Sequence, residues 1–128
     1  MPKAIDASAL RKRLWTAYER LGQLLTAMLQ HQVLLRGSVY ELHTRCGKPS
    51  CACRKDERKR HHRWVLSESW EGRTRMRVVP LNAIAFWKKW AASYRQFRSN
   101  RSETVKLCQQ LLTDLDAFER AQRRDPNK

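Results

Sequence analysis

The sequence is short of the residues that break regular structure, with only four glycines and four prolines among 128 residues. Acidic residues are also scarce, because 12 Asp and Glu stand against 27 Lys and Arg and leave a formal net charge of +15. There are no internal repeats and no low-complexity tracts. With 41% hydrophobic and 30% charged residues, the composition is typical of a folded chain with one modest core and excludes an intrinsically disordered one.

Long apolar runs are absent too. None approaches the roughly 18–20 residues needed to cross a bilayer, and the first residues, MPKAIDASAL, lack the apolar core of a secretory signal. We therefore expect a cytoplasmic protein with reduced thiols and no membrane partner. The sequence also lacks a Gly-rich phosphate loop, a Ser/His/Asp layout and a carboxylate cluster suited to Mg²⁺, so we expect no enzyme.

Positive charge is abundant and unevenly distributed. Residues 36–77 carry seven of the fifteen net positive charges. A small body with so much charge repels itself, so a polyanion is its natural counterpart. Nucleic acid is the first candidate and an anionic membrane surface the second, against the plain alternative of a solvated basic surface.

Apolar residues at heptad spacing predict two long helices. The first spans residues 8–35, with Ser8 as its cap, Gly37 as its end and an apolar seam formed by Leu10, Leu14, Ala17, Leu21, Leu24, Met28 and Leu35. The second region spans residues 82–122 from Asn82, and its seam keeps phase through Leu111, Leu115 and Phe118. Asn100 and Glu103 have the form of a capping box that could restart a helix, so one long helix and two shorter ones both stay open.

Residues 36–80 have a different character, because their pattern alternates as in β-strands. Strands are predicted over residues 38–45, 63–70 and 74–79, with a hairpin turn over residues 71–73 centred on Gly72 and a stop at Pro80. Trp64, Leu66 and Trp70 are expected to share one face. The predicted fold class is α+β: a single domain over residues 1–128, with a small antiparallel ribbon between two helices that pack as a coiled-coil-like hairpin. A homodimer would double that hairpin into a four-helix arrangement.

The segment CGKPSCACRKDERKRHH, residues 46–62, places three cysteines and two histidines around a basic stretch. Zinc takes four thiolate or imidazole ligands in a tetrahedron, so the predicted structural zinc ligands are Cys46, Cys51, Cys53 and His61, with His62 as the alternate. His43 could compete for the fourth position. The alternatives are reduced structural thiols, an iron–sulfur site or a regulatory disulfide. Cys108 falls on the helical seam and is predicted to be a core thiol.

Basic residues surround the cysteines and continue into the hairpin. If they share one side of the molecule, they form a strip that matches phosphate spacing, whereas the alternative is a solvated charge run. The candidate nucleic-acid-binding residues are Arg45, Lys48, Arg54, Lys55, Arg58, Lys59, Arg60, Arg63, Arg73, Arg75 and Arg77.

The stretches RGSVYELHTRCGKPSCAC and GRTRMRVVP resemble an uncharacterised prokaryotic family of small, basic, cysteine-containing proteins known as a domain of unknown function. The resemblance covers roughly residues 36–98 and rests on an R-G-S motif, an R-C-G-K-P-x-C-x-C motif and a following histidine. Where family members read H-G-P-Y, this sequence reads HHRW, so the resemblance leaves open which histidine is the metal ligand. The resemblance implies an association with mobile elements and so a place beside a transposase or recombinase.

These observations together predict a zinc-containing nucleic-acid-binding accessory protein, with DNA favoured over RNA. The alternative function is a protein-interaction adaptor or oligomerisation module whose helical seam docks a transposase or recombinase.

Overall fold

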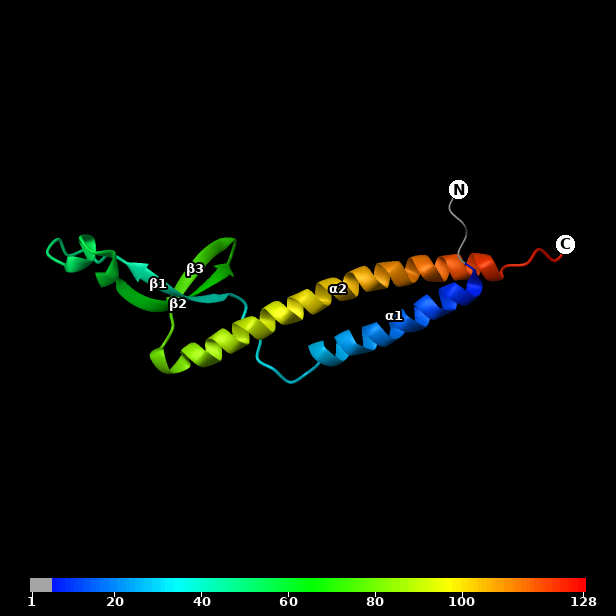
Figure 1. Cartoon of the computed structure of the whole chain (residues 1–128), viewed down its shortest axis with the longest axis horizontal. Coiled ribbons are helices and arrows are strands. Elements are labelled where there is room, and N and C mark those ends of the chain that lie inside the picture. The colour runs from blue at the N-terminus through cyan, green and yellow to red at the C-terminus, as the bar shows by residue number, and fades with distance from the viewer. Residues whose placement is uncertain (1–5) are drawn as a thin grey trace. The chain divides into compact units, whose positions relative to one another are not determined.

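The computed structural model describes residues 6–128, which form two compact units (Figure 1). The helical unit comprises the chain up to His31 together with Phe97–Lys128, and the sheet unit comprises Gln32–Gln96. The elements are α1 (Ala7–Met28), β1 (Ser38–Thr44), β2 (His61–Trp70), β3 (Arg73–Val78) and α2 (Ile84–Gln122). Because α2 supplies residues to both units, the single domain over residues 1–128 stays a prediction.

Helix α1 begins one residue earlier than the sequence predicts. Its cap is Asp6, whose carboxylate accepts a hydrogen bond of 2.7 Å from the backbone N–H of Ala9. Ser8, the predicted cap, lies inside the first turn, because an aspartate two residues upstream already satisfies a free amide there. The predicted seam is confirmed within α1: Leu10 and Leu24 are buried, and its other members up to Met28 are half-buried.

The predicted extension of this helix to residue 35 is wrong. The helix ends at Met28, where the N–H of Leu29 still bonds the carbonyl of Leu25 at 2.9 Å. The chain then turns at residues 29–31 and continues without regular structure, and the N–H of Leu35 donates to the carbonyl of Trp90 at 3.1 Å. The Leu35 N–H thus bonds a residue distant in sequence and not the carbonyl four residues before it, as it would in a helix. Gly37 does not end the helix.

Helix α2 is continuous for 39 residues and follows a short 3-10 turn at Leu81–Ala83. The capping box at Asn100 and Glu103 does not interrupt it. The Glu103 carboxylate instead accepts two hydrogen bonds, at 2.9 and 2.6 Å, from Nη2 of Arg20 in α1. Within the helical unit, α1 lies alongside the C-terminal part of α2 (Figure 1). The α+β class with two helices and a small antiparallel sheet is confirmed.

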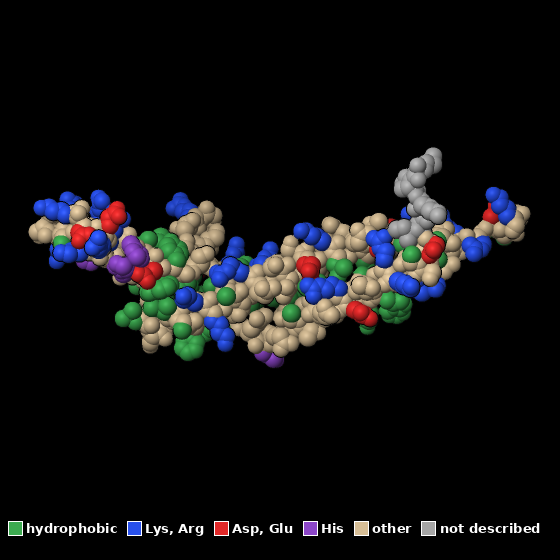
Figure 2. Space-filling model, in the orientation of Figure 1, with side chains coloured by type: hydrophobic (Ala, Val, Ile, Leu, Met, Phe, Trp, Pro, Cys, Tyr) green, Lys and Arg blue, Asp and Glu red, His purple; other side chains and the backbone are tan. Residues whose placement is uncertain are grey.

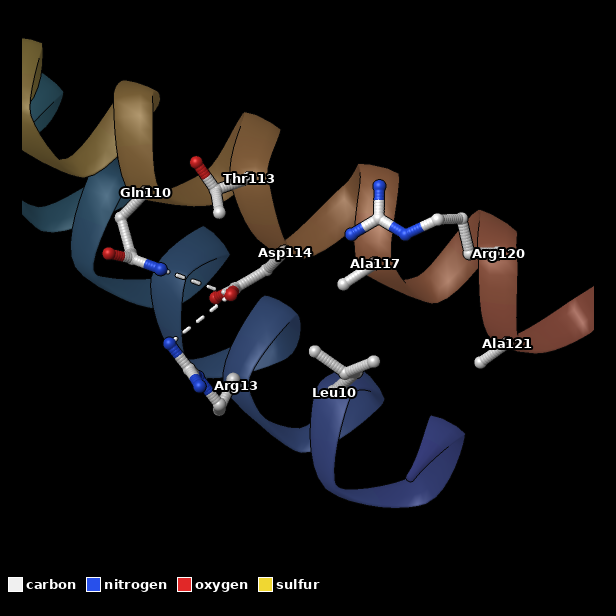
Figure 3. Close-up of a pocket in the computed structure, with 8 residues that line it drawn as sticks. All are labelled: Leu10, Arg13, Gln110, Thr113, Asp114, Ala117, Arg120 and Ala121. Atoms are coloured by element: carbon white, nitrogen blue, oxygen red, sulfur yellow. Dashed lines mark hydrogen bonds and ion pairs between the residues drawn. The ribbon is translucent and has the colours of Figure 1, made fainter. Parts of the chain in front are cut away.

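The two helices of the helical unit enclose one buried carboxylate. Asp114 is 5% exposed, forms an ion pair with Arg13 at 3.2 Å and accepts a hydrogen bond from Gln110 at 3.1 Å (Figure 3). The heptad pattern had placed Leu115 in the seam, but Leu115 is 42% exposed. A straight helix has 3.6 residues per turn, so a strict 3.5-residue repeat drifts out of phase along 39 residues.

The sheet is antiparallel with the order β1-β2-β3. A two-residue turn joins β2 to β3, and both of its residues have positive φ: 48° at Glu71 and 77° at Gly72. Positive φ at both positions is the signature of a tight hairpin, which glycine tolerates best. The predicted hairpin centre is confirmed.

Both faces of β2 are covered at its middle, because Val65 and Leu66 are 2% and 0% exposed. On the Leu66 face, the start of α2 packs against the sheet, with the Lys88 ammonium 4.9 Å from the centre of the Trp64 ring. Trp70 shares that face by alternation, as predicted. It is nevertheless 52% exposed, because it lies at the hairpin end.

Candidate metal centre

The connection from β1 to β2 holds the cysteines and has almost no apolar core. It contains two single-turn 3-10 helices, Ala52–Arg54 and Glu57–Lys59. Short local hydrogen bonds shape it: the N–H of Cys51 donates to the Lys48 carbonyl at 3.2 Å, and the Asp56 carboxylate accepts from the N–H of Arg58 at 3.0 Å. Only Cys53 is buried in these turns. Such a loop needs a further constraint to keep one conformation.

Four side chains, three from this loop and one from the start of β2, converge on one point. The ligand atoms of Cys46, Cys51, Cys53 and His61 all lie within 4.8 Å of one another. The sulfurs of Cys46 and Cys53 are 3.5 Å apart, and the Cys51 sulfur is 3.4 Å from Nε2 of His61. In tetrahedral zinc, bonds of about 2.3 Å to sulfur and 2.0–2.1 Å to nitrogen put two sulfurs about 3.8 Å apart, and a sulfur and a nitrogen about 3.5 Å apart. The four residues therefore could bind a metal ion, as the sequence predicts.

The surroundings of the sulfurs differ. The pKa of Cys51 falls to about 6, because a backbone N–H at Cys53 and then the His61 imidazole stabilise its thiolate. At Cys53 the backbone N–H of Cys46 lies 3.3 Å from the sulfur and favours the thiolate, but burial and the neighbouring sulfurs outweigh it and raise the pKa. A divalent cation would relieve this crowding, since metal-bound thiols lose their protons.

The two adjacent histidines belong to different groups, because neighbouring residues of a strand point to opposite faces. His61 joins the cysteines. His62 is the register partner of His43, and both donate to the Glu41 carboxylate, at 2.6 and 3.0 Å. The pKa of Glu41 is lowered, chiefly by the hydrogen bond from His62. Desolvation acts in the opposite direction, and the charge of His43 lowers this pKa further. The geometry favours His61 over both alternates, His62 and His43.

Cys108 lies half-buried on α2 within the helical unit and is not a member of the cysteine group.

Lys and Arg side chains crowd the end of the sheet unit that carries the cysteine loop (Figure 2). Seven of the predicted residues there are exposed and form no ion pair within residues 6–128: Arg45, Lys48, Arg54, Lys55, Arg58, Lys59 and Arg63. Arg60 differs, since it is half-buried and contacts Glu57 at 3.4 Å. The acidic residues of the loop are thus used locally, and most of its cations stay available to a partner.

The hairpin arginines are largely engaged. Glu68, whose side chain is 12% exposed, accepts from Arg75 at 2.6 Å and from Arg77 at 3.0 Å. The Arg75 guanidinium also lies 4.0 Å from the centre of the Trp70 ring. Of the three hairpin arginines, only Arg73 forms no ion pair with another described residue. Sequence reasoning missed Glu68, although a hairpin centred on Glu71 and Gly72 places it directly opposite Arg75.

Within residues 6–128, no helix is both long and apolar enough to cross a membrane.

The comparisons with known proteins give one family. No curated protein and no solved structure matches the chain significantly. The sequence profile of a domain of unknown function, DUF6788, matches residues 8–83. This match begins farther toward the N-terminus than the resemblance seen in the sequence, so it takes in α1, the cysteine loop and the sheet and stops just before α2. Because it covers more than half of the chain, this protein belongs to the DUF6788 family of domains of unknown function.

Proposed function

We propose that the protein is a zinc-stabilised nucleic-acid-binding protein that favours DNA over RNA. The observation that carries the proposal is the Cys46, Cys51, Cys53 and His61 group, which closes both ends of a loop dense in Lys and Arg. Zinc suits three sulfurs and one imidazole, and four protein ligands leave no position for water. The metal therefore has a structural role in this proposal.

The cations of the loop support contacts to phosphate. Arg54, Lys55, Arg58 and Lys59 are exposed, and within the described residues none has an acidic partner. A loop held at both ends loses less conformational entropy on binding than a free basic tail. The engaged hairpin arginines Arg75 and Arg77 form a smaller part of this footprint, because a phosphate would compete with Glu68 for them.

The salt dependence of binding tests the proposal. On B-DNA the logarithm of the binding constant falls with the logarithm of salt concentration, with a slope of about −0.9 for each phosphate contact. Reversing two loop cations, Arg58→Glu with Lys59→Glu, should weaken binding and make the slope less negative by about 1.8. Fluorescence anisotropy of a labelled duplex over a salt series measures both quantities.

The matched control is Lys12→Glu with Lys106→Glu, which makes the same change in net charge on exposed positions of α1 and α2. If charge alone governed binding, both double variants would lose the same affinity, and the loop would be no specific footprint. Wild-type protein that shows no affinity for DNA, or no salt slope, would contradict the proposal. A parallel series with single-stranded DNA and RNA identifies the preferred nucleic acid.

A second candidate function is an oligomerisation module. An apolar groove of ≈ 290 Å³ lies between α1 and α2 of the helical unit, lined by Leu14, Trp15, Tyr18 and Leu115 among others. Trp15 and Tyr18 are 61% and 64% exposed, and their rings meet edge to face at 5.7 Å. A second copy of this chain would cover the groove and complete a four-helix core. The alternative occupant is the transposase or recombinase of a prokaryotic mobile element, which the family resemblance implies.

A further inference from the structure

A second group of metal-ligand side chains lies on the sheet, outside the cysteine group. Glu41, His43 and His62 place one carboxylate oxygen and two ring nitrogens within 4.8 Å of one another. The Nδ1 atom of His62 is 2.6 Å, and the Nε2 atom of His43 3.0 Å, from the same oxygen, Oε1 of Glu41. The two imidazole rings lie 4.0 Å apart, centre to centre, with a tilt of 41°. Both rings therefore direct a nitrogen at one point.

The backbone fixes this arrangement. His43 and His62 are paired partners in the β1–β2 register, so their side chains leave the sheet next to each other on one face. Glu41 lies two residues before His43 on the same strand and so on the same face. All three side chains thus come from paired strands and not from a loop, which reduces the reorganisation that a ligand would require.

We propose that Glu41, His43 and His62 form a second divalent-metal site, distinct from the cysteine group. Two imidazoles and one carboxylate are a ligand set that zinc uses in proteins, and the same set suits other divalent first-row metals. Three protein ligands leave at least one coordination position open to an exogenous oxygen donor such as water or a phosphate. This is the chief contrast with the cysteine group, whose four ligands complete a tetrahedron.

The two sites share no ligand. His61 and His62 are neighbours in β2 but point to opposite faces of the sheet, so each group can load without the other. All three side chains of the second group are part-exposed, with 34–50% of each side chain accessible, so an ion can reach them from solvent. This inference concerns metal content alone and does not rest on the nucleic-acid proposal.

Cobalt(II) distinguishes the two sites in one experiment. Cobalt bound by thiolates gives intense charge-transfer absorption, whereas cobalt bound by nitrogen and oxygen gives only weak bands. Native mass spectrometry of the full chain loaded with cobalt should count two ions for each chain. His43→Ala should reduce this number from two to one and keep the charge-transfer absorption. Cys51→Ser should also reduce it to one but greatly weaken that absorption.

Two further variants make the result decisive. Glu41→Gln keeps the size and hydrogen-bonding capacity of the side chain but removes the anionic oxygen, and it should also bind one ion. His31→Ala removes an exposed histidine outside both groups, and it should still bind two. Wild-type protein that binds a single cobalt ion, or a His43→Ala or Glu41→Gln variant that still binds two, overturns the second site.

Discussion

Single residues set the start of the sheet, and Gly37 is the clearest case. It has a φ of 149°, which side-chain-bearing residues rarely adopt. A Cβ atom at this position would lie 2.7 Å from Cδ1 of Leu66 and 2.8 Å from the carbonyl oxygen of Ser67. Gly37 therefore allows the entry to β1 to approach β2 closely, next to the most buried residue of the sheet.

Gly37→Ala should destabilise the protein by about 2–4 kcal/mol, which combines backbone strain of about 1–3 kcal/mol with the overlap against Leu66. The comparison variant is Gly22→Ala in α1, where an added Cβ atom meets nothing within 4 Å. It should stabilise the protein by about 1 kcal/mol, because alanine is the better helix former. Urea unfolding at fixed zinc concentration measures both changes. Equal effects of the two variants would refute this role of Gly37.

For single residues, the sequence predicts the cysteine ligands more readily than the histidines and the carboxylate that lie near them. The spacing of Cys46, Cys51 and Cys53 within eight residues is visible without any structure. The choice between His61 and His62 is not, because it depends on which face of β2 each residue occupies. Glu41 and His43 were missed as a group for the same reason: their contact with His62 depends on strand register.

Among the elements, the cysteine loop depends most on a ligand. Its two 3-10 turns bury only Cys53, so few apolar contacts hold them. Metal binding that organises such a segment contributes directly to its folding free energy. The helical unit has its own buried residues, Leu10 and Leu24, and does not contain the metal group.

We therefore expect removal of metal by a chelator to unfold the loop and leave α1 and α2 helical. Trypsin should then cut after Arg54, Lys55 and Arg58 much faster than in the zinc-loaded protein, while the helical circular dichroism changes little. Cys51→Ser should behave like the chelated protein, and Cys108→Ser, outside the group, like the wild type. The same cleavage rates with and without zinc would show that the loop does not depend on metal.

The helices show how far periodicity predicts an element. The seam of α1 follows from its apolar spacing up to Met28, because the helix is short enough for a 3.5-residue repeat to hold. The sequence could not show that Leu35 lies outside this helix, since the N–H of Leu35 bonds a carbonyl of α2 that is distant in sequence. The burial of Asp114 was missed because a buried carboxylate needs partners, and Arg13 comes from the other helix.

For the whole molecule, the unpartnered apolar groove predicts association of the chain with itself. Trp15→Glu with Tyr18→Glu would put two charges into that groove and should shift the protein from dimer to monomer in light scattering coupled to size-exclusion chromatography. Leu112→Glu is the matched control, because Leu112 is 59% exposed on α2 but does not line the groove. A wild-type chain that is monomeric at high concentration would rule out the homodimer and leave a different protein as the occupant.

The alternation of His61 and His62 along β2 has a consequence for how the chain tolerates change. A shift of β2 by a single position against β1 would turn His61 away from the sulfurs and His62 away from Glu41 in the same movement. It would also exchange the faces of Val65 and Leu66, which are both fully enclosed. An insertion or deletion within the first residues of this strand should therefore abolish both ion-binding groups together. An insertion or deletion in the exposed segment 57–59 should leave the group on the sheet, Glu41, His43 and His62, intact.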